Sequence, residues 1–142
     1  MKYVSIAEGR SLDGLRLVLT MGMPGPWGLA IRSVYDYKGI GYTAVAQIPG
    51  ESDQELLDWT GQASAPVVVL NDEIPRCGWQ EQLYLAERLE PSSPLIPLDA
   101  ADRALMFGLM REIAGEQGFA WNRRLMMFQP SMGSSVTCTT LS

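Results

Sequence analysis

The stretch SAPVVVLNDE, residues 64–73, decides the fold. Its compact aliphatic run, Val67 to Leu70, predicts a buried strand. Asn71-Asp72 predicts a turn, and Glu73 to Pro75 a short antiparallel return strand. The Ala65-Pro66 bond lies directly before the strand Val67 to Leu70. At this position, the missing N–H of proline removes no hydrogen bond between strands. The stretch therefore predicts a strand, turn and strand entered through a proline.

Upstream of this stretch, the sequence predicts a strand, a helix and a second strand. Aliphatic residues dominate 15–21, and 42–48 alternates or runs apolar, as strands do. The segment 22–28 between them is rich in glycine and proline and predicts a loop. It leads into a helix over 29–38, with Gly39 just past its end. A right-handed crossover makes the two strands parallel.

Two further helices are predicted around the central stretch. Ser52 and Glu55 have the spacing of a capping box, which predicts a short helix through Trp59. After the return strand, residues 79–89 predict a helix with an apolar face. The predicted order up to residue 89 is therefore strand, helix, strand and helix, followed by a hairpin and a last helix, which indicates a mixed α/β domain.

The pattern changes after residue 89. The segment EPSSPLIPL, residues 90–98, contains three prolines and two serines, which predicts a linker. Asp99 is a suitable N-cap for a helix through Ala114. The buried stripe expected on this helix consists of Leu105, Leu109, Met110 and Ile113. Another short helix is expected over 121–128, and the Ser/Thr-rich end 129–142 is expected to be mobile.

The composition narrows the class of protein. Of the 142 residues, 46% are hydrophobic and 19% charged, which is ordinary for a soluble domain. The net charge of −5, from 11 basic and 16 acidic residues, argues against nucleic-acid binding, which requires a basic face. No leader peptide is expected, and no apolar run is long enough for a membrane helix. A cytoplasmic protein without membrane or nucleic-acid partners is expected.

The sequence contains no histidine. This removes the commonest general base and the commonest metal ligand, and it excludes Ser-His and Cys-His nucleophile pairs. The two cysteines, Cys77 and Cys138, form no CxxC pair, so neither a dithiol centre nor a zinc ribbon is expected. No metal is therefore expected, and any catalysis must use hydroxyls, carboxylates, a thiolate or backbone amides.

Four segments, in this order and spacing, resemble the glutathione transferase superfamily. SAPVVVLNDE, residues 64–73, is similar to the X-Pro bond and third strand of the family, and PGPWGLAIRSVYDYKGIGY, residues 24–42, to its active-site loop, first helix and second strand. YLAERLEP, residues 84–91, looks like the end of the last helix of its first domain. PLIPLDAADRALMFGLM, residues 94–110, resembles the interdomain linker and the first helix of its helical domain.

The resemblance implies an α/β thioredoxin-like domain (βαβ-α-ββα) over residues 15–90. An N-terminal extension, 1–14, precedes it. The linker occupies 91–98, and residues 99–128 form part of the family's all-helical second domain before the flexible tail 129–142. So short a helical segment implies a truncated form of that domain. A homodimer is expected to cover its apolar stripe.

The resemblance also implies a glutathione site built largely from backbone groups. The backbone of Ala65, before a cis Pro66, pairs with the cysteinyl backbone of glutathione like an added strand. The γ-glutamyl carboxylate lies at the start of the last helix, where Gly78 and Trp79 supply N–H groups. The family has an acidic residue and a serine there, whereas this chain has Cys77 and Gly78.

The catalytic position departs from the family as well. Members place Tyr, Ser or Cys where the glutathione thiol binds, and the Ser/Cys register falls on Gly25-Pro26-Trp27 here. Gly25 and Trp27 are therefore expected to contact glutathione without supplying a hydroxyl or thiol. Thr20 and Cys77 are the nearest candidates for a catalytic group.

Two functions stay open from the sequence. One is a glutathione transferase that conjugates glutathione, as co-substrate, to small hydrophobic electrophiles. The other is a noncatalytic binding or interaction protein with the same fold. A fold alone does not decide between them.

Overall fold

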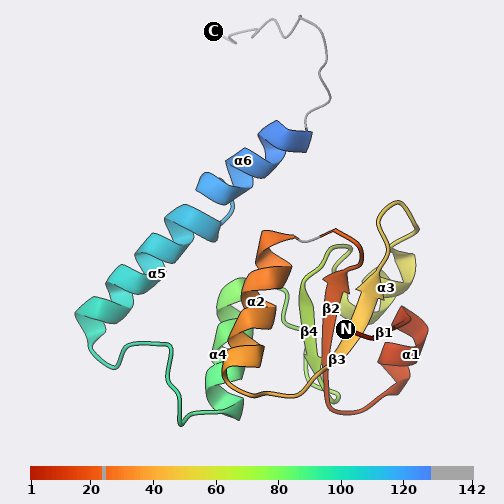
Figure 1. Cartoon of the computed structure of the whole chain (residues 1–142), viewed down its shortest axis with the longest axis horizontal. Coiled ribbons are helices and arrows are strands. Elements are labelled where there is room, and N and C mark those ends of the chain that lie inside the picture. Colours follow the sequence, from red (N-terminus) through yellow and green to blue (C-terminus); the bar gives the residue numbers. More distant parts are fainter. Residues whose placement is uncertain (24, 129–142) are drawn as a thin grey trace, which may run out of the picture. The chain divides into compact units, whose positions relative to one another are not determined.

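The computed structural model describes residues 1–23 and 25–128. Figure 1 shows a sheet with helices on both faces, followed along the chain by two further helices. The chain divides into two units, Met1–Leu95 and Ile96–Ser142. This division falls inside the segment predicted as a linker. None of the helices in the described ranges is both long and apolar enough to cross a membrane.

Four strands form one sheet in the order β1-β3-β2-β4. They span Tyr3–Val4 (β1), Leu15–Thr20 (β2), Thr43–Gln47 (β3) and Val67–Leu70 (β4). β2 pairs parallel with β3 and antiparallel with β4. The predicted parallel pair is therefore confirmed, and β2 and β3 are the two inner strands of the sheet.

Helices cover both faces of the sheet (Figure 1). α2 (Pro26–Tyr37) and α4 (Trp79–Leu89) lie side by side on one face, and α1 (Ile6–Ser11) and α3 (Gln54–Thr60) lie on the other. Successive side chains of β2 point to opposite faces of the sheet, so this strand contributes to the core on both faces. Leu17 packs in the cluster with residues of α2 and α4, whereas Val18 packs in the cluster with Leu56 of α3. This layered α/β architecture is the predicted one.

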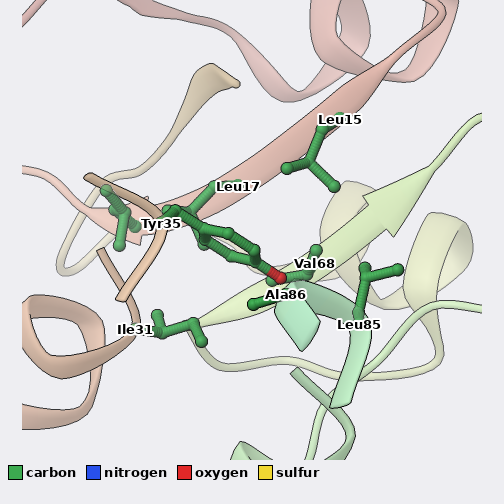
Figure 2. Packing of buried hydrophobic residues seen from close by; sticks show 8 residues of the cluster. Leu15, Leu17, Ile31, Tyr35, Val68, Leu85 and Ala86 are labelled. Atoms are coloured by element: carbon green, nitrogen blue, oxygen red, sulfur yellow. The ribbon is translucent and has the colours of Figure 1, made fainter. Parts of the chain in front are cut away.

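Tyr35 lies at the centre of the larger core (Figure 2). Its fully buried ring packs in one cluster with Leu17, Val68 and Ala86. Its hydroxyl donates a hydrogen bond of 3.1 Å to the carbonyl oxygen of Gln82 on α4. Burial raises the pKa of the Tyr35 phenol, so the proton in this bond is retained. The core thereby joins α2 to α4 through a polar contact as well as apolar packing.

Residues 1–14, expected as an extension ahead of the domain, instead supply β1 and α1. β1 pairs parallel with β3, Tyr3 opposite Ala44 and Val4 opposite Val45. α1 packs on β3 through Gly9, where an added Cβ would lie 2.6 Å from a Val45 methyl carbon. A two-residue strand and a six-residue helix are too short to leave a periodic pattern in the sequence.

Two predicted helix starts in the first unit differ from the structure. α2 begins at Pro26, three residues early, because proline at the first helical position needs no N–H partner. α3 begins after Asp53, and the predicted Ser52–Glu55 capping box is absent from these described residues. The Ser52 hydroxyl instead accepts from the N–H of Gln54 at 3.3 Å.

The return strand predicted over Glu73 to Pro75 is wrong: no strand is formed there, and a single bridge joins Val68 to Arg76, one residue further along. The two residues exchange backbone hydrogen bonds of 3.0 and 2.8 Å. The next bonded pair would join Leu70 to Ile74, but the Leu70 carbonyl oxygen instead accepts from the Glu73 N–H at 2.9 Å, within the turn. α4 then begins and ends where the sequence predicted, at Trp79 and Leu89.

The second unit contains α5 (Ala100–Ala114) and α6 (Phe119–Phe128). Asp99 caps α5 as predicted, its carboxylate accepting from the N–H groups of Ala101 and Asp102. The stripe expected to be buried is mostly exposed: the exposed fractions are 62% for Leu105, 54% for Leu109 and 55% for Ile113, while Met110 is half-buried. α6 begins two residues earlier than predicted. The tail 129–142 lies outside the described residues.

A buried lysine fastens the end of the first unit to α2. Lys38 follows α2, and its side chain is 0% exposed. Its ammonium donates to the carbonyl oxygens of Glu90 and Ser93 at 2.7 and 2.8 Å, and lies 3.0 Å from the Glu87 carboxylate. These three oxygens satisfy all three donors of the ammonium group.

Replacing this ammonium should destabilise the first unit. We expect Lys38→Met to lower the free energy of unfolding by about 2–3 kcal/mol, because Glu87 and two carbonyls lose a buried partner. Urea unfolding measures the change. The matched control is Arg32→Met, which removes an exposed ion pair with Asp36 and should cost less than about 0.5 kcal/mol. Equal losses in the two variants would contradict the role of Lys38.

Candidate functional site

The predicted site residues lie at the ends of four elements. Thr20 is the last residue of β2, and Gly25 is the N-cap of α2. Ala65 stands two residues ahead of β4, and Gly78 is the N-cap of α4. Val18 pairs with Val67, so the antiparallel register continued past the ladder brings Ala65 opposite Thr20. The ends of β2 and β3 and the segment before β4 thus meet.

The Ala65-Pro66 peptide bond is cis, as the resemblance implied. We call the backbone of these two residues, with the adjoining ends of β2 and β3, the cis-proline slot. The Ala65 N–H does not point into empty space. It donates to the side-chain oxygen of Gln47 at 3.2 Å.

Gln47 ends β3, and its side chain makes four hydrogen bonds to other described residues. Its Oε1 accepts from the Thr20 hydroxyl at 3.1 Å as well as from Ala65. Its Nε2 donates to the Asp53 carboxylate at 2.9 Å and to the carbonyl oxygen of Ala63 at 3.1 Å. The strand register, which places Thr20 opposite Gln47, sets up the first of these contacts. Gln47 therefore ties the ends of two strands to the segment before β4.

A second amide, that of Gln82, ties the cis-proline slot to the start of α4. Gln82 is 0% exposed. Its Nε2 lies 3.1 Å from the carbonyl oxygen of Pro66, 3.0 Å from that of Arg76 and 3.5 Å from that of Cys77. Its Oε1 is buried without a hydrogen-bond partner in the part of the chain that the structure describes. The two N–H groups of the amide are therefore shared among three carbonyl oxygens, at the cost of one unpaired side-chain oxygen.

The start of α4 has an internal acceptor. The Gly78 N–H donates to the Glu81 carboxylate at 3.2 Å. Trp79, the first helical residue, is half-buried. The nearby Arg76 guanidinium pairs with Glu73, on the turn after β4. A ligand carboxylate at this helix start would meet the negative charge of Glu81.

Cys77 is an exposed thiol beside this helix start. Partial burial of its sulfur raises the pKa of the Cys77 thiol, and the Glu81 carboxylate raises it further. A raised pKa leaves little thiolate at neutral pH, and thiolate is the nucleophilic form. The environment of Cys77 is thus the opposite of the one that activates a catalytic cysteine.

Gly25 occupies open space at the start of α2. A Cβ added there would meet nothing within 4 Å, and its φ of −74° is open to any residue. Trp27 is half-buried in the first turn of the same helix. The Thr20 hydroxyl is directed to Gln47. Within residues 1–23 and 25–128, no cluster of three or more acidic, cysteine or histidine residues is placed to hold a metal ion.

Sequence reasoning missed both glutamines. Gln47 was predicted only as part of a strand, although a polar residue closing an apolar strand beside Thr20 was a usable signal. Gln82 shares a helix face with Leu85, Ala86 and Leu89. A glutamine in line with that apolar face was the sign of a buried amide.

Comparison with solved structures identifies proteins of the same fold. A tau class glutathione S-transferase from mango, Mangifera indica, aligns at 21% identity over 80% of this chain and 57% of its own, with a TM-score of 0.58. A Sulfitobacter glutathione transferase homologue with bound glutathione aligns at 15% identity over 82% and 64%, with a TM-score of 0.60. A maleylacetoacetate isomerase from Anaeromyxobacter dehalogenans, with bound dicarboxyethyl glutathione, aligns at 21% over 83% and 58%, with a TM-score of 0.55.

These likenesses show a shared fold, a thioredoxin-like domain followed by helices, as in glutathione transferases. The chain spans 57% to 64% of the length of these three structures. The sequence matches no family profile and no curated protein.

Removing the buried amide of Gln82 tests its structural role. We expect Gln82→Met to lower the free energy of unfolding by about 1–3 kcal/mol, because three carbonyl groups lose a donor while one unpaired oxygen is removed. Gln80→Met, an exposed change on the same helix, should stay within about 0.5 kcal/mol in the same denaturant series. A Gln82 variant as stable as the wild type would refute this role.

The reactivity of Cys77 should follow its raised pKa. We expect iodoacetamide to alkylate Cys77 more slowly at pH 7 than a free cysteine, with the rate rising as pH increases and thiolate forms. Glu81→Gln removes a negative charge, so it lowers the thiol pKa and speeds alkylation. Peptide mapping by mass spectrometry separates Cys77 from Cys138. Alkylation faster than free cysteine at pH 7 would contradict the electrostatic argument.

Proposed function

We propose that the chain binds glutathione at the cis-proline slot and that its own side chains give the bound thiol little activation. The observation that carries this proposal is the convergence of Ala65, ahead of β4, with the ends of β2 and β3, next to the helix α4 that Gln82 ties to Pro66. Solved proteins of the same fold that carry bound glutathione support it.

In this proposal the peptide backbone of glutathione pairs with the backbone of Ala65 as an added strand. The γ-glutamyl carboxylate lies at the start of α4, where the N–H groups of Gly78 and Trp79 and the helix dipole favour an anion. Gly25 and Trp27 lie beside the thiol end. Glu81 opposes the carboxylate, so we expect modest rather than tight affinity.

Activation of the thiol is the weak part of the site. Gly25 supplies no hydroxyl, the Thr20 hydroxyl is directed to Gln47, and the Cys77 pKa is raised. Backbone N–H groups alone stabilise a thiolate less than they do with an added hydroxyl donor. We therefore favour binding over conjugation, with conjugation to a small hydrophobic electrophile as the second candidate.

Turnover and binding measured on the same protein separate the two. We expect calorimetry to show glutathione binding, and absorbance to show almost no conjugation of chlorodinitrobenzene. Gly25→Ser adds the missing hydroxyl into open space and should raise conjugation by about tenfold or more. The matched control is Gly41→Ser, another open, exposed glycine, which should leave the rate unchanged.

Each result has a definite reading. Absence of glutathione binding by the wild type rejects glutathione as the ligand. Binding with fast conjugation by the wild type rejects the proposal in favour of an active transferase. A Gly25→Ser rate equal to that of Gly41→Ser would mean that residue 25 does not face the bound thiol.

Assembly and location stay predictions. A homodimer would cover the exposed leucine and isoleucine side chains of α5, which supports the prediction of a second copy. A cytoplasmic location fits glutathione as a ligand, because the cytosol is the compartment in which glutathione keeps thiols reduced.

A further inference from the structure

Two donors converge on one oxygen atom in the cis-proline slot. The Thr20 hydroxyl lies 3.1 Å, and the Ala65 N–H 3.2 Å, from Gln47 Oε1. One donor comes from the end of β2 and the other from the segment ahead of β4. A carbonyl oxygen has two lone pairs, so it can accept both bonds at once. The geometry therefore defines a position for an oxygen acceptor.

The group that fills this position is a primary amide. Gln47 carries the same carbonyl and N–H functions as a peptide bond. It presents its oxygen to Ala65, while its nitrogen donates to Asp53 and to the backbone of Ala63. An added ligand strand would also present a peptide carbonyl to the Ala65 N–H. Gln47 thus makes, from inside the chain, a contact that the ligand needs.

We propose that Gln47 is a built-in occupant of the cis-proline slot, and that a peptide carbonyl of the ligand displaces its side chain on binding. This inference rests on the proposed function and specifies the ligand group: a peptide carbonyl, which a simple thiol lacks. The ligand oxygen takes over both the Thr20 hydroxyl and the Ala65 N–H. The departing amide regains hydrogen bonds from water.

This exchange affects both affinity and selectivity. On binding, the ligand oxygen accepts the two hydrogen bonds that Gln47 Oε1 accepts in the free protein. The two hydrogen bonds that Gln47 Nε2 donates are lost and are replaced by bonds to water. The wild type therefore binds glutathione more weakly than a variant that lacks the Gln47 side chain. Small thiols without a peptide group, such as cysteamine, cannot replace the lost acceptor and are rejected.

Removing the side chain provides the main test. We expect Gln47→Ala to bind glutathione about five- to tenfold more tightly than the wild type, because no internal group competes for the two donors. Gln54→Ala is the matched control, since the exposed Gln54 amide donates to Asp58 on its own helix; its affinity should equal that of the wild type. Calorimetry gives all three dissociation constants.

A second measurement uses the wild type and does not depend on how the variant folds. In a 15N spectrum, we expect the Ala65 amide of the free protein to be protected from exchange. On titration with glutathione, the Gln47 side-chain amide signals should move toward those of a solvated amide. Cysteamine should leave them in place.

The outcomes separate this inference from the proposed function. If the wild type binds glutathione while Gln47→Ala binds equally or more weakly, Gln47 is no competitor and only this inference fails. Unmoved Gln47 signals at saturating glutathione would also overturn it alone. If neither protein binds glutathione, the proposed function fails and the inference fails with it.

Discussion

Strand β2 is hydrogen-bonded along both edges and buried on both faces, and the arrangement of the other elements of the first unit depends on this constraint. It pairs with β3 on one side and β4 on the other, so all three strands end at related positions. Leu17 and Val18 are 0% exposed on opposite faces, and burying both requires helices on either side. Polar groups at the end of such a strand are partly shielded from water and must find partners nearby. Thr20, Gln47 and Ala65 do so with one another.

The sequence predicted well those parts of the fold in which one physical signal dominates. Aliphatic runs located β2, β3 and β4, and helical periodicity located α4 to the residue. β1 was missed because a two-residue strand is stabilised by pairing with β3 rather than by any property of its own side chains. The cis bond at Pro66 came from a family resemblance, since no local feature distinguishes it from a trans bond.

The candidate site was predicted in position but not in its hydrogen bonds. Backbone donors at Ala65 and Gly78 were expected to be available, yet each has a side-chain acceptor from the same chain, Gln47 or Glu81. Such pairs depend on distances between segments that sequence spacing does not specify. In the free protein, these pairs satisfy backbone donors that a ligand would otherwise bind. The ligand must replace the internal acceptors, which lowers its affinity. A fold shared with glutathione transferases is compatible with this arrangement without conferring their activity.

The edges of the sheet have a consequence for association between chains. β1 has only two residues and is followed at once by α1, while the outer side of β4 carries the Val68–Arg76 bridge next to Pro75. A long, flat edge strand offers unpaired backbone groups to the edge of another molecule, which is a common route to aggregation. Within the described residues, both edges are short or interrupted. The domain should therefore resist edge-to-edge stacking even at high concentration, and its associations should take place through side chains.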